Sequence, residues 1–281
     1  MKPFCAALHI IYVDTKIPTY HFFFYNKPSS YMLKLYGHFG SQPTRSVAWL
    51  LKMKKTPFEF ITINPTTGET RTPQYREKFS LGLIPAIEDT DSSPPFTLSE
   101  ASAIMIYLCE KHQWNDFYPT TSDKFAIQRR ARINEYCSHH NESTRLMTRK
   151  VIFPTMKWMF SDRKGTAGSG ASSTGVAHLS NSSKDIDKTK ATIRDIAKRF
   201  QHKFLANDSL YIVEGDTPSI ADLLAYPDIA QIPQIMGIDY YEEWPELEPL
   251  SKWLDRMSAL PEHDDIHKTI HKIGKMYRSK L

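Results

Sequence analysis

The sequence predicts a protein of two domains: an α/β domain over residues 32–113 and an all-α domain over residues 122–281. Two observations support this division. The first part alternates short apolar runs, typical of strands, with segments of helical period, whereas every periodic segment after residue 122 is helical. The chain has 281 residues, of which 41% are hydrophobic, so it is long enough to build two cores.

The α/β domain is predicted to begin with a strand at Leu33–Gly37 and a helix at Pro43–Lys55. Pro43 suits the first helical turn, where a backbone N–H is not needed. The other expected elements are a strand at Phe58–Ile63, a short helix from Thr72 to Phe79, a hairpin of Ile84–Glu88 and Phe96–Leu98, and a helix at Ala101–Lys111. The order βαβ, then α, then ββα is that of a thioredoxin-like domain.

The second domain is predicted to contain only helices. We expect a long helix from Asp123 to about Phe160, bent near Pro154 because proline interrupts the backbone hydrogen bonds. Residues 161–184 are rich in Gly, Ser and Thr, which predicts a disordered insert. Ser219 and Asp222 predict a capping-box variant. Further helices are expected at Ile186–Ala206, Ile220–Met236, Glu246–Ala259 and Glu262–Tyr277.

Composition narrows the classes of function. Basic residues are interspersed with acidic ones and the net charge is only +5, which predicts a solvated surface and no nucleic-acid partner. No stretch is long and apolar enough to predict a membrane span. Cys5, Cys109 and Cys137 are far apart, a pattern that favours a reducing, cytoplasmic compartment over a disulfide framework or zinc site. Residues 1–31 are expected to be a disordered extension before a natural start at Met32.

Six short motifs occur in order within residues 33–278. They are Ser41-Gln42-Pro43 followed by Arg45, Ile84-Pro85-Ala86, Leu98-Ser99-Glu100, Arg132–Tyr136, Phe153-Pro154 and Pro218–Leu223. Together they resemble the cytosolic glutathione S-transferases, most of all the theta class. The resemblance implies the glutathione transferase architecture, glutathione as co-substrate without a metal, and a homodimer. The implied activity is detoxification, by conjugating the glutathione thiolate to small hydrophobic electrophiles.

Ser41 matches the family residue whose hydroxyl donates to the glutathione sulfur. A free thiol titrates near pH 8.5, so a thiolate at neutral pH needs stabilisation. One hydroxyl hydrogen bond and the positive end of the following helix contribute roughly 1–3 kcal/mol, or about one to two pKa units. The alternative is that Ser41 only caps that helix. Tyr36 is the other candidate hydroxyl, but its position within a strand predicts a core aromatic.

The resemblance also assigns backbone contacts to glutathione. Pro85 is expected to follow a cis peptide bond, with the backbone of Ile84 contacting the cysteinyl residue of glutathione. Glu100 matches a residue that contacts the γ-glutamyl end. The alternatives are an ordinary trans proline at a strand start and an acid stabilised by the helix dipole alone.

Three further positions of the glutathione site depart from the family pattern. Thr70, Leu83 and Ala101 stand where the family often has a histidine, a basic residue, and Ser or Thr, respectively. If each lost contact costs about 1 kcal/mol, glutathione binding is roughly a hundredfold weaker. Two alternatives therefore stay open: a non-enzymatic protein of this fold that binds ligands or proteins, and a glutathione-dependent dehalogenase or peroxidase.

His263, His267 and His271 repeat every four residues and so share one face of the last helix. Paired histidines at this spacing can bind zinc. No further ligand is evident in the sequence, so we predict no metal site there.

A pocket for the electrophile is expected between the two domains. Arg145, His140 and Trp158 are the residues expected to border it. The alternative is that they belong to the core of the helical domain.

Overall fold

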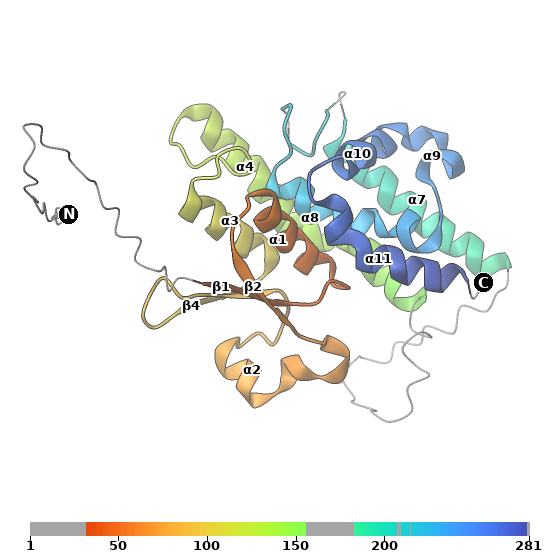
Figure 1. The fold of residues 1–281 in the computed structure, drawn as a ribbon. Helices are drawn as coiled ribbons and strands as arrows, with labels where there is room; N and C mark the ends of the chain where they lie inside the picture. Colours follow the sequence, from red (N-terminus) through yellow and green to blue (C-terminus); the bar gives the residue numbers. More distant parts are fainter. Residues whose placement is uncertain (1–31, 156–182, 207–208, 214, 280–281) are drawn as a thin grey trace, which may run out of the picture.

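The computed structural model describes residues 32–155, 183–206, 209–213 and 215–279. A four-stranded sheet of order β2-β1-β3-β4 forms the centre of the first domain. One face of the sheet carries α1 and α3, and α2 lies on the opposite face (Figure 1). The bounds in this domain are β1 (Leu33–Gly37), α1 (Gln42–Met53), β2 (Phe58–Thr62), η1 (Pro65–Thr67), η2 (Glu69–Arg71), α2 (Pro73–Lys78), β3 (Ala86–Asp89), β4 (Phe96–Ser99) and α3 (Ala101–His112).

The central strand β1 pairs with a neighbour on each side. It runs parallel to β2, with Leu35 opposite Phe60, and antiparallel to β3, with Leu35 opposite Ile87. Its side chains alternate between the faces of the sheet, so Leu33 and Leu35 are fully buried under α1 and α3 while Lys34 and Tyr36 face the other way. The predicted thioredoxin-like domain is confirmed, and each of its predicted elements is present.

The second part of the described chain is helical, as predicted. Its bounds are α4 (Lys124–His139), η3 (His140–Glu142), α5 (Arg145–Met147), η4 (Thr148–Ile152), α7 (Ser183–Phe204), α8 (Ile220–Ile229), η5 (Ile232–Met236), α9 (Tyr240–Glu243), η6 (Pro245–Leu247), α10 (Glu248–Ser258) and α11 (His263–Arg278). Both η4 and η5 are turns of π-helix. No helix in the described ranges is long and apolar enough to cross a membrane.

The prediction of one helix from Asp123 to Phe160 was wrong. The helix α4 ends at His139, and short helical pieces follow it to residue 155. Ser143 leaves the helical conformation, with φ −124° and ψ −106°, and its hydroxyl donates to the carbonyl of His140 (3.3 Å). Short polar side chains compete with the helix for its backbone groups, which explains the break within this polar run.

Two predicted disordered segments fall largely outside the described residues. All of residues 1–31 and most of the insert 161–184 belong to this undescribed part. The last two residues of the predicted insert, Ser183 and Lys184, form the start of α7. The predicted helix Ile220–Met236 is divided at Ala230 into α8 and the π-helical turn η5.

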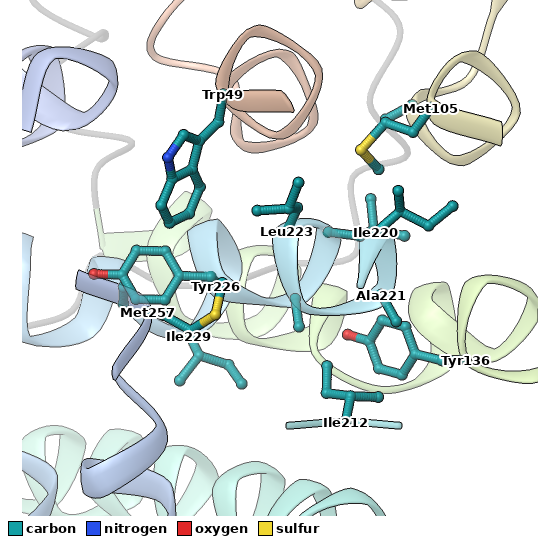
Figure 2. Close-up of a cluster of buried hydrophobic side chains, with 14 of the residues drawn as sticks. Trp49, Met105, Tyr136, Ile212, Ile220, Ala221, Leu223, Tyr226, Ile229 and Met257 are labelled. Carbon is teal, nitrogen blue, oxygen red and sulfur yellow. The ribbon is translucent and has the colours of Figure 1, made fainter. Parts of the chain in front are cut away.

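The helix α8 lies at the centre of the core and packs against helices of the first domain. Figure 2 shows Leu223 and Tyr226 of α8 facing Trp49 of α1, with Met105 of α3 near Ile220. All five residues are at most 3% exposed. The predicted capping box at the start of this helix is confirmed. The Ser219 side chain accepts a hydrogen bond from the backbone at Asp222, and the Asp222 side chain accepts one from the backbone N–H of Ser219.

Gly274 allows α11 to approach the π-helical turn η5 closely. A Cβ atom at this position would lie 2.0 Å from the carbonyl oxygen of Gln234. Such an overlap forces the two elements apart, and overpacking typically costs about 1–3 kcal/mol. Alanine has a higher helix propensity than glycine, but this gain is only about 1 kcal/mol and is smaller than the expected cost of the overlap.

We therefore expect Gly274→Ala to destabilise the protein. The expected loss of about 2 kcal/mol lowers the thermal midpoint by roughly 4–8 °C for a protein of this size. Differential scanning calorimetry measures the midpoint, with Lys272→Ala, an exposed change on the same helix, as the control. A midpoint for Gly274→Ala within 1 °C or so of the control would contradict this account of the contact.

Candidate active site

Ser41 lies in the turn between β1 and α1, where it caps the helix. Its Oγ accepts a long hydrogen bond from the backbone N–H of Thr44 (3.4 Å), and its own N–H donates to the carbonyl of His38 (2.8 Å). The side chain is partly exposed. A serine hydroxyl has one proton and two acceptor lone pairs, so capping uses a lone pair and leaves the proton available to a ligand. Capping and donation to a sulfur are therefore compatible.

The cis peptide bond predicted at Ile84–Pro85 is confirmed. The sheet places this bond near the turn that carries Ser41. Tyr36 pairs with Ala86 across β1 and β3, so continuing the register by one step puts Pro85 opposite Gly37. Ile84 therefore lies across from the start of the turn, with its backbone beyond the last strand pair and available to a bound peptide.

Glu100 comes to the same end of the sheet. Ala86 pairs with Ser99 of β4, so the next residue, Glu100, lies across from Pro85. Its backbone has φ 74° and ψ 117°, and its exposed side chain makes no capping bond to α3. A non-glycine residue in this region is strained by about 1–3 kcal/mol, and such strain is concentrated at functional sites.

The first turn of α3 completes this end of the sheet. Ala101 is its first residue and is buried, so its position offers a backbone N–H and no hydroxyl. Free N–H groups at the N-terminus of a helix attract carboxylates. The sheet thus brings three of the predicted motifs together: the Ser41 hydroxyl, the Ile84–Pro85 backbone and the start of α3.

Thr70 and Leu83, also predicted at the glutathione site, contribute no charged group there. Thr70 is buried in η2, where its carbonyl lies close under Gly82. The side chain of Leu83 is 48% exposed, and its carbonyl accepts a hydrogen bond from the Tyr75 hydroxyl (2.8 Å). The structure therefore leaves the expected weakness of glutathione binding in place.

Tyr36 directs its hydroxyl away from Ser41, on the α2 side of the sheet. The hydroxyl donates to Glu88 (2.7 Å) and accepts from Lys78 (2.8 Å), while the ring packs edge-on against Phe79. Burial raises the pKa of Tyr36, and the hydrogen bond from Lys78 opposes this rise only in part. Ser41 is thus the better placed of the two candidate hydroxyls.

Arg145 contacts both domains, whereas the polar contacts of His140 lie within the helical domain. Arg145 is partly exposed and donates to Gln42 of α1 (3.0 Å) and to Asp228 of α8 (3.2 Å). His140 is buried, and its ring contacts Thr144 (2.9 Å) and Asp228 (3.3 Å). Trp158, the third expected pocket residue, lies outside the described residues.

The histidine face of α11 packs against aromatic residues. His263 and His267 stack with ring centroids 4.6 Å apart, and both lie near the ring of Trp49. Nε2 of His263 bonds to the Tyr226 hydroxyl (2.7 Å), and Nδ1 of His267 donates to the carbonyl of His263 (2.9 Å). Burial, with the nearby charge of Arg45, lowers the pKa of His267 well below its usual value. These contacts assign the face a packing role.

The two described cysteines are not suited to act as nucleophiles. Burial raises the pKa of the Cys109 thiol to about 12, and it does the same for Cys137. Neither thiol is therefore ionised near neutral pH.

Comparison with known proteins identifies similar sequences and folds. Residues 32–110 match the glutathione S-transferase N-terminal domain family. Glutathione S-transferase theta-1 of Homo sapiens is 28% identical over 248 residues, which cover 86% of this chain and 88% of the relative. Glutathione S-transferase theta-2 of Rattus norvegicus is 25% identical over 233 residues, 81% of each chain.

Solved structures give the same result. A human theta-class glutathione transferase, in complex with the glutathione conjugate of 1-menaphthyl sulfate, superimposes with a TM-score of 0.68 at 25% identity and covers 89% of this chain and 91% of that one. Human glutathione S-transferase T1-1 in its apo form has a TM-score of 0.63 at 26% identity, with 86% and 91% covered. Residues 32–110 thus match the glutathione S-transferase N-terminal domain, and the chain as a whole is similar to theta-class glutathione S-transferases.

Proposed function

We propose that this protein conjugates the glutathione thiolate to small hydrophobic electrophiles, a detoxification reaction. The observation that carries the proposal is the convergence described above. One end of the sheet holds the Ser41 hydroxyl, the backbone beside the cis bond at Ile84–Pro85, and the strained start of α3 at Glu100. Several relatives of similar fold are named glutathione S-transferases, and one solved relative holds a glutathione conjugate.

In the proposed mechanism, the Ser41 hydroxyl is the group of this chain that acts on the reacting sulfur. The thiol proton of bound glutathione is released to solvent, and the Ser41 hydroxyl donates a hydrogen bond to the resulting thiolate while its oxygen keeps the bond from the Thr44 N–H. The donated bond and the N-terminus of α1 stabilise the thiolate, lowering the thiol pKa by about one to two units. The thiolate then attacks the electrophilic carbon, a new C–S bond forms, and the leaving group takes the electron pair of the bond that breaks.

Glutathione is held mainly through backbone groups in this proposal. The N–H and C=O of Ile84 pair with the cysteinyl residue, and the first turn of α3 at Glu100 and Ala101 receives the γ-glutamyl carboxylate. Arg145 is partly exposed, donates to Gln42 (3.0 Å) and is proposed to border the electrophile. No electrophile is singled out by these residues, so a dehalogenase or peroxidase reaction stays an outcome of the activity assay.

Glutathione affinity is expected to be in the millimolar range, because the hydroxyl and cationic side chains common in the family are missing at Ala101, Leu83 and Thr70. Isothermal titration calorimetry measures it. Ala101→Ser restores one hydroxyl and should tighten binding about fivefold, a gain of roughly 1 kcal/mol. Ala103→Ser, on the same helix, is the control and should not tighten it. A low-micromolar Kd for the unmodified protein would contradict the weak-site account.

The proposal as a whole is tested by turnover with several soft electrophiles at saturating glutathione. Turnover that depends on glutathione supports it. No heat of glutathione binding together with no turnover would favour the non-enzymatic alternative, a ligand-binding protein of this fold.

We also propose a homodimer in the cytoplasm, from the resemblance to the family. Multi-angle light scattering at micromolar concentration is expected to give twice the 32.5 kDa mass of the chain. A single-chain mass across that range would count against the dimer.

A further inference from the structure

A buried carboxylate lies at the centre of a polar network between the domains. Asp228 of α8 is 1% exposed, and it accepts hydrogen bonds from Arg145 (3.2 Å) and the Thr148 hydroxyl. Burial alone would raise the pKa of Asp228, but Arg145 and His140 outweigh it and hold that pKa below the usual value. The network therefore contains a buried carboxylate whose Oδ1 accepts both hydrogen bonds and whose Oδ2 faces Nε2 of His140 (3.3 Å), in a place where an unpaired charge would be strongly unfavourable.

From Asp228 the network reaches α1 by two routes. On the first, Arg145 also donates to Oε1 of Gln42 (3.0 Å). On the second, the Thr148 hydroxyl donates to the Asp228 carboxylate and accepts from Gln231. Gln231 also donates to the backbone carbonyl of Asp228 (2.9 Å), and its Oε1 accepts from Nε2 of Gln42 (2.6 Å). Both polar atoms of the Gln42 amide are thus held by the helical domain.

The backbone of the helical domain is adapted to this arrangement. Thr148 opens the π-helical turn η4, and Gln231 immediately precedes the π-helical turn η5. Both residues are fully buried. Wide turns of this kind inside helices are frequent at functional sites. The network therefore crosses the domain boundary where two helices depart from regular geometry.

Gln42 is the first residue of α1 and directly follows Ser41. Because both polar atoms of the Gln42 amide are held, the backbone of Gln42 is restrained. This restraint extends to the adjacent N-cap residue, Ser41. Sub-ångström placement of a donor matters, because a displacement of about 1 Å can reduce a rate a hundredfold. The clamp on Gln42 thus acts on the group that the proposed reaction depends on.

We propose that the Asp228 carboxylate is a positioning residue for the reaction at Ser41, acting on the amide of Gln42 directly through Arg145 and, through Thr148, by way of Gln231. The inference rests on the proposed function, because it concerns the hydroxyl assigned to the thiolate. A purely structural role predicts a loss of stability and no change at Ser41. A through-space charge effect predicts the opposite sign, since removing a negative charge favours a thiolate.

The test compares three variants. Asp228→Asn keeps the shape of the side chain and removes its charge, whereas Gln42→Met removes the clamped amide and leaves every charge in place. The matched control is Tyr226→Phe, on the same helix, which loses the buried bond to His263 (2.7 Å) and keeps every charge in place. For each protein, the thiol pKa of bound glutathione is measured from thiolate absorbance, together with kcat, KM and the thermal midpoint.

We expect Asp228→Asn and Gln42→Met to raise the bound-thiol pKa by about one unit and to lower kcat near pH 6.5 about tenfold, with KM for glutathione changed less than about twofold. Tyr226→Phe should lower only the thermal midpoint. A bound-thiol pKa that falls in Asp228→Asn would overturn the proposal. So would a pKa and kcat unchanged in both Asp228→Asn and Gln42→Met.

A second readout works without glutathione. The amides of Thr44 and Arg45 bond to Ser41, so their hydrogen exchange reports how firmly the first turn of α1 is held. Exchange at these amides should be about tenfold faster in Asp228→Asn and Gln42→Met than in Tyr226→Phe. If the unmodified protein neither binds nor turns over glutathione, the proposed function fails and this exchange result alone decides the role of Asp228. Equal exchange in all variants would then refute it.

Discussion

Asp222→Ala is expected to remove a large part of the stability of the helical domain. The carboxylate of Asp222 is fully buried and accepts hydrogen bonds from the N–H of Ile212 (2.9 Å), the N–H of Ser219 (2.8 Å) and the indole of Trp253 (3.0 Å). Alanine leaves these three donors without partners. Each unsatisfied buried donor costs about 1–3 kcal/mol, so the expected loss is about 3–9 kcal/mol out of a typical 5–15 kcal/mol.

Urea unfolding followed by circular dichroism measures this loss. Asp216→Ala, an exposed acid in the preceding loop, is the control and should change the free energy of unfolding by less than about 0.5 kcal/mol. A loss below about 1.5 kcal/mol for Asp222→Ala would mean that water or other groups replace the carboxylate.

Asp222 also illustrates what local sequence can predict. Ser219 and Asp222 are three residues apart, and their mutual capping follows from helix geometry alone. The bond from Trp253 joins residues 31 positions apart and depends on how α10 packs against α8. Local patterns therefore predicted the start of the helix, and tertiary packing decided that its carboxylate would be buried.

The inter-domain network was missed for the same reason. Gln42, Asp228 and Gln231 are polar residues in helical segments, and such residues usually face solvent. The available signal was the position of Asp228 and Gln231 within the apolar run of residues 220–236, where polar side chains need buried partners. Those partners come from α1 and from residues 140–148, so one helix examined alone could not reveal them.

The predicted site depended on strand order more than on any single motif. The order βαβ, α, ββα places the ends of β1, β3 and β4 side by side, which brings Ser41, Ile84 and Glu100 to the same end of the sheet. The direction of the Tyr36 hydroxyl also follows from the two-residue period of β1. Its partners, Lys78 and Glu88, come from other elements and were not predicted.

Ser41→Ala is expected to lower kcat at saturating glutathione at least tenfold. The lost hydrogen bond is made mainly to the thiolate, so its removal acts on the reacting sulfur more than on the bound peptide. Glutathione binding should change little, because the backbone at Ile84 and the start of α3 still contact the tripeptide. Turnover at saturating glutathione and calorimetric titration measure the two effects separately.

The control for Ser41→Ala is the loss of a different helix cap, Thr72→Ala. Thr72 caps α2 just as Ser41 caps α1, with its hydroxyl accepting from the N–H of Tyr75 (3.3 Å). Both substitutions to alanine remove a cap and should cost about 1 kcal/mol of stability. Only Ser41→Ala should reduce turnover, so a similar loss in Thr72→Ala would indicate a general effect of capping.

The pKa of the glutathione thiol bound to the unmodified protein, to Ser41→Ala and to Thr72→Ala tests the central claim most directly. Thiolate absorbance across pH 5 to 9 or so gives this value in each complex. The account predicts a pKa about one to two units below the free value near 8.5 in the unmodified protein and in Thr72→Ala, and a return toward the free value in Ser41→Ala. A lowered pKa that persists in Ser41→Ala would contradict the account and leave Ser41 as a helix cap alone.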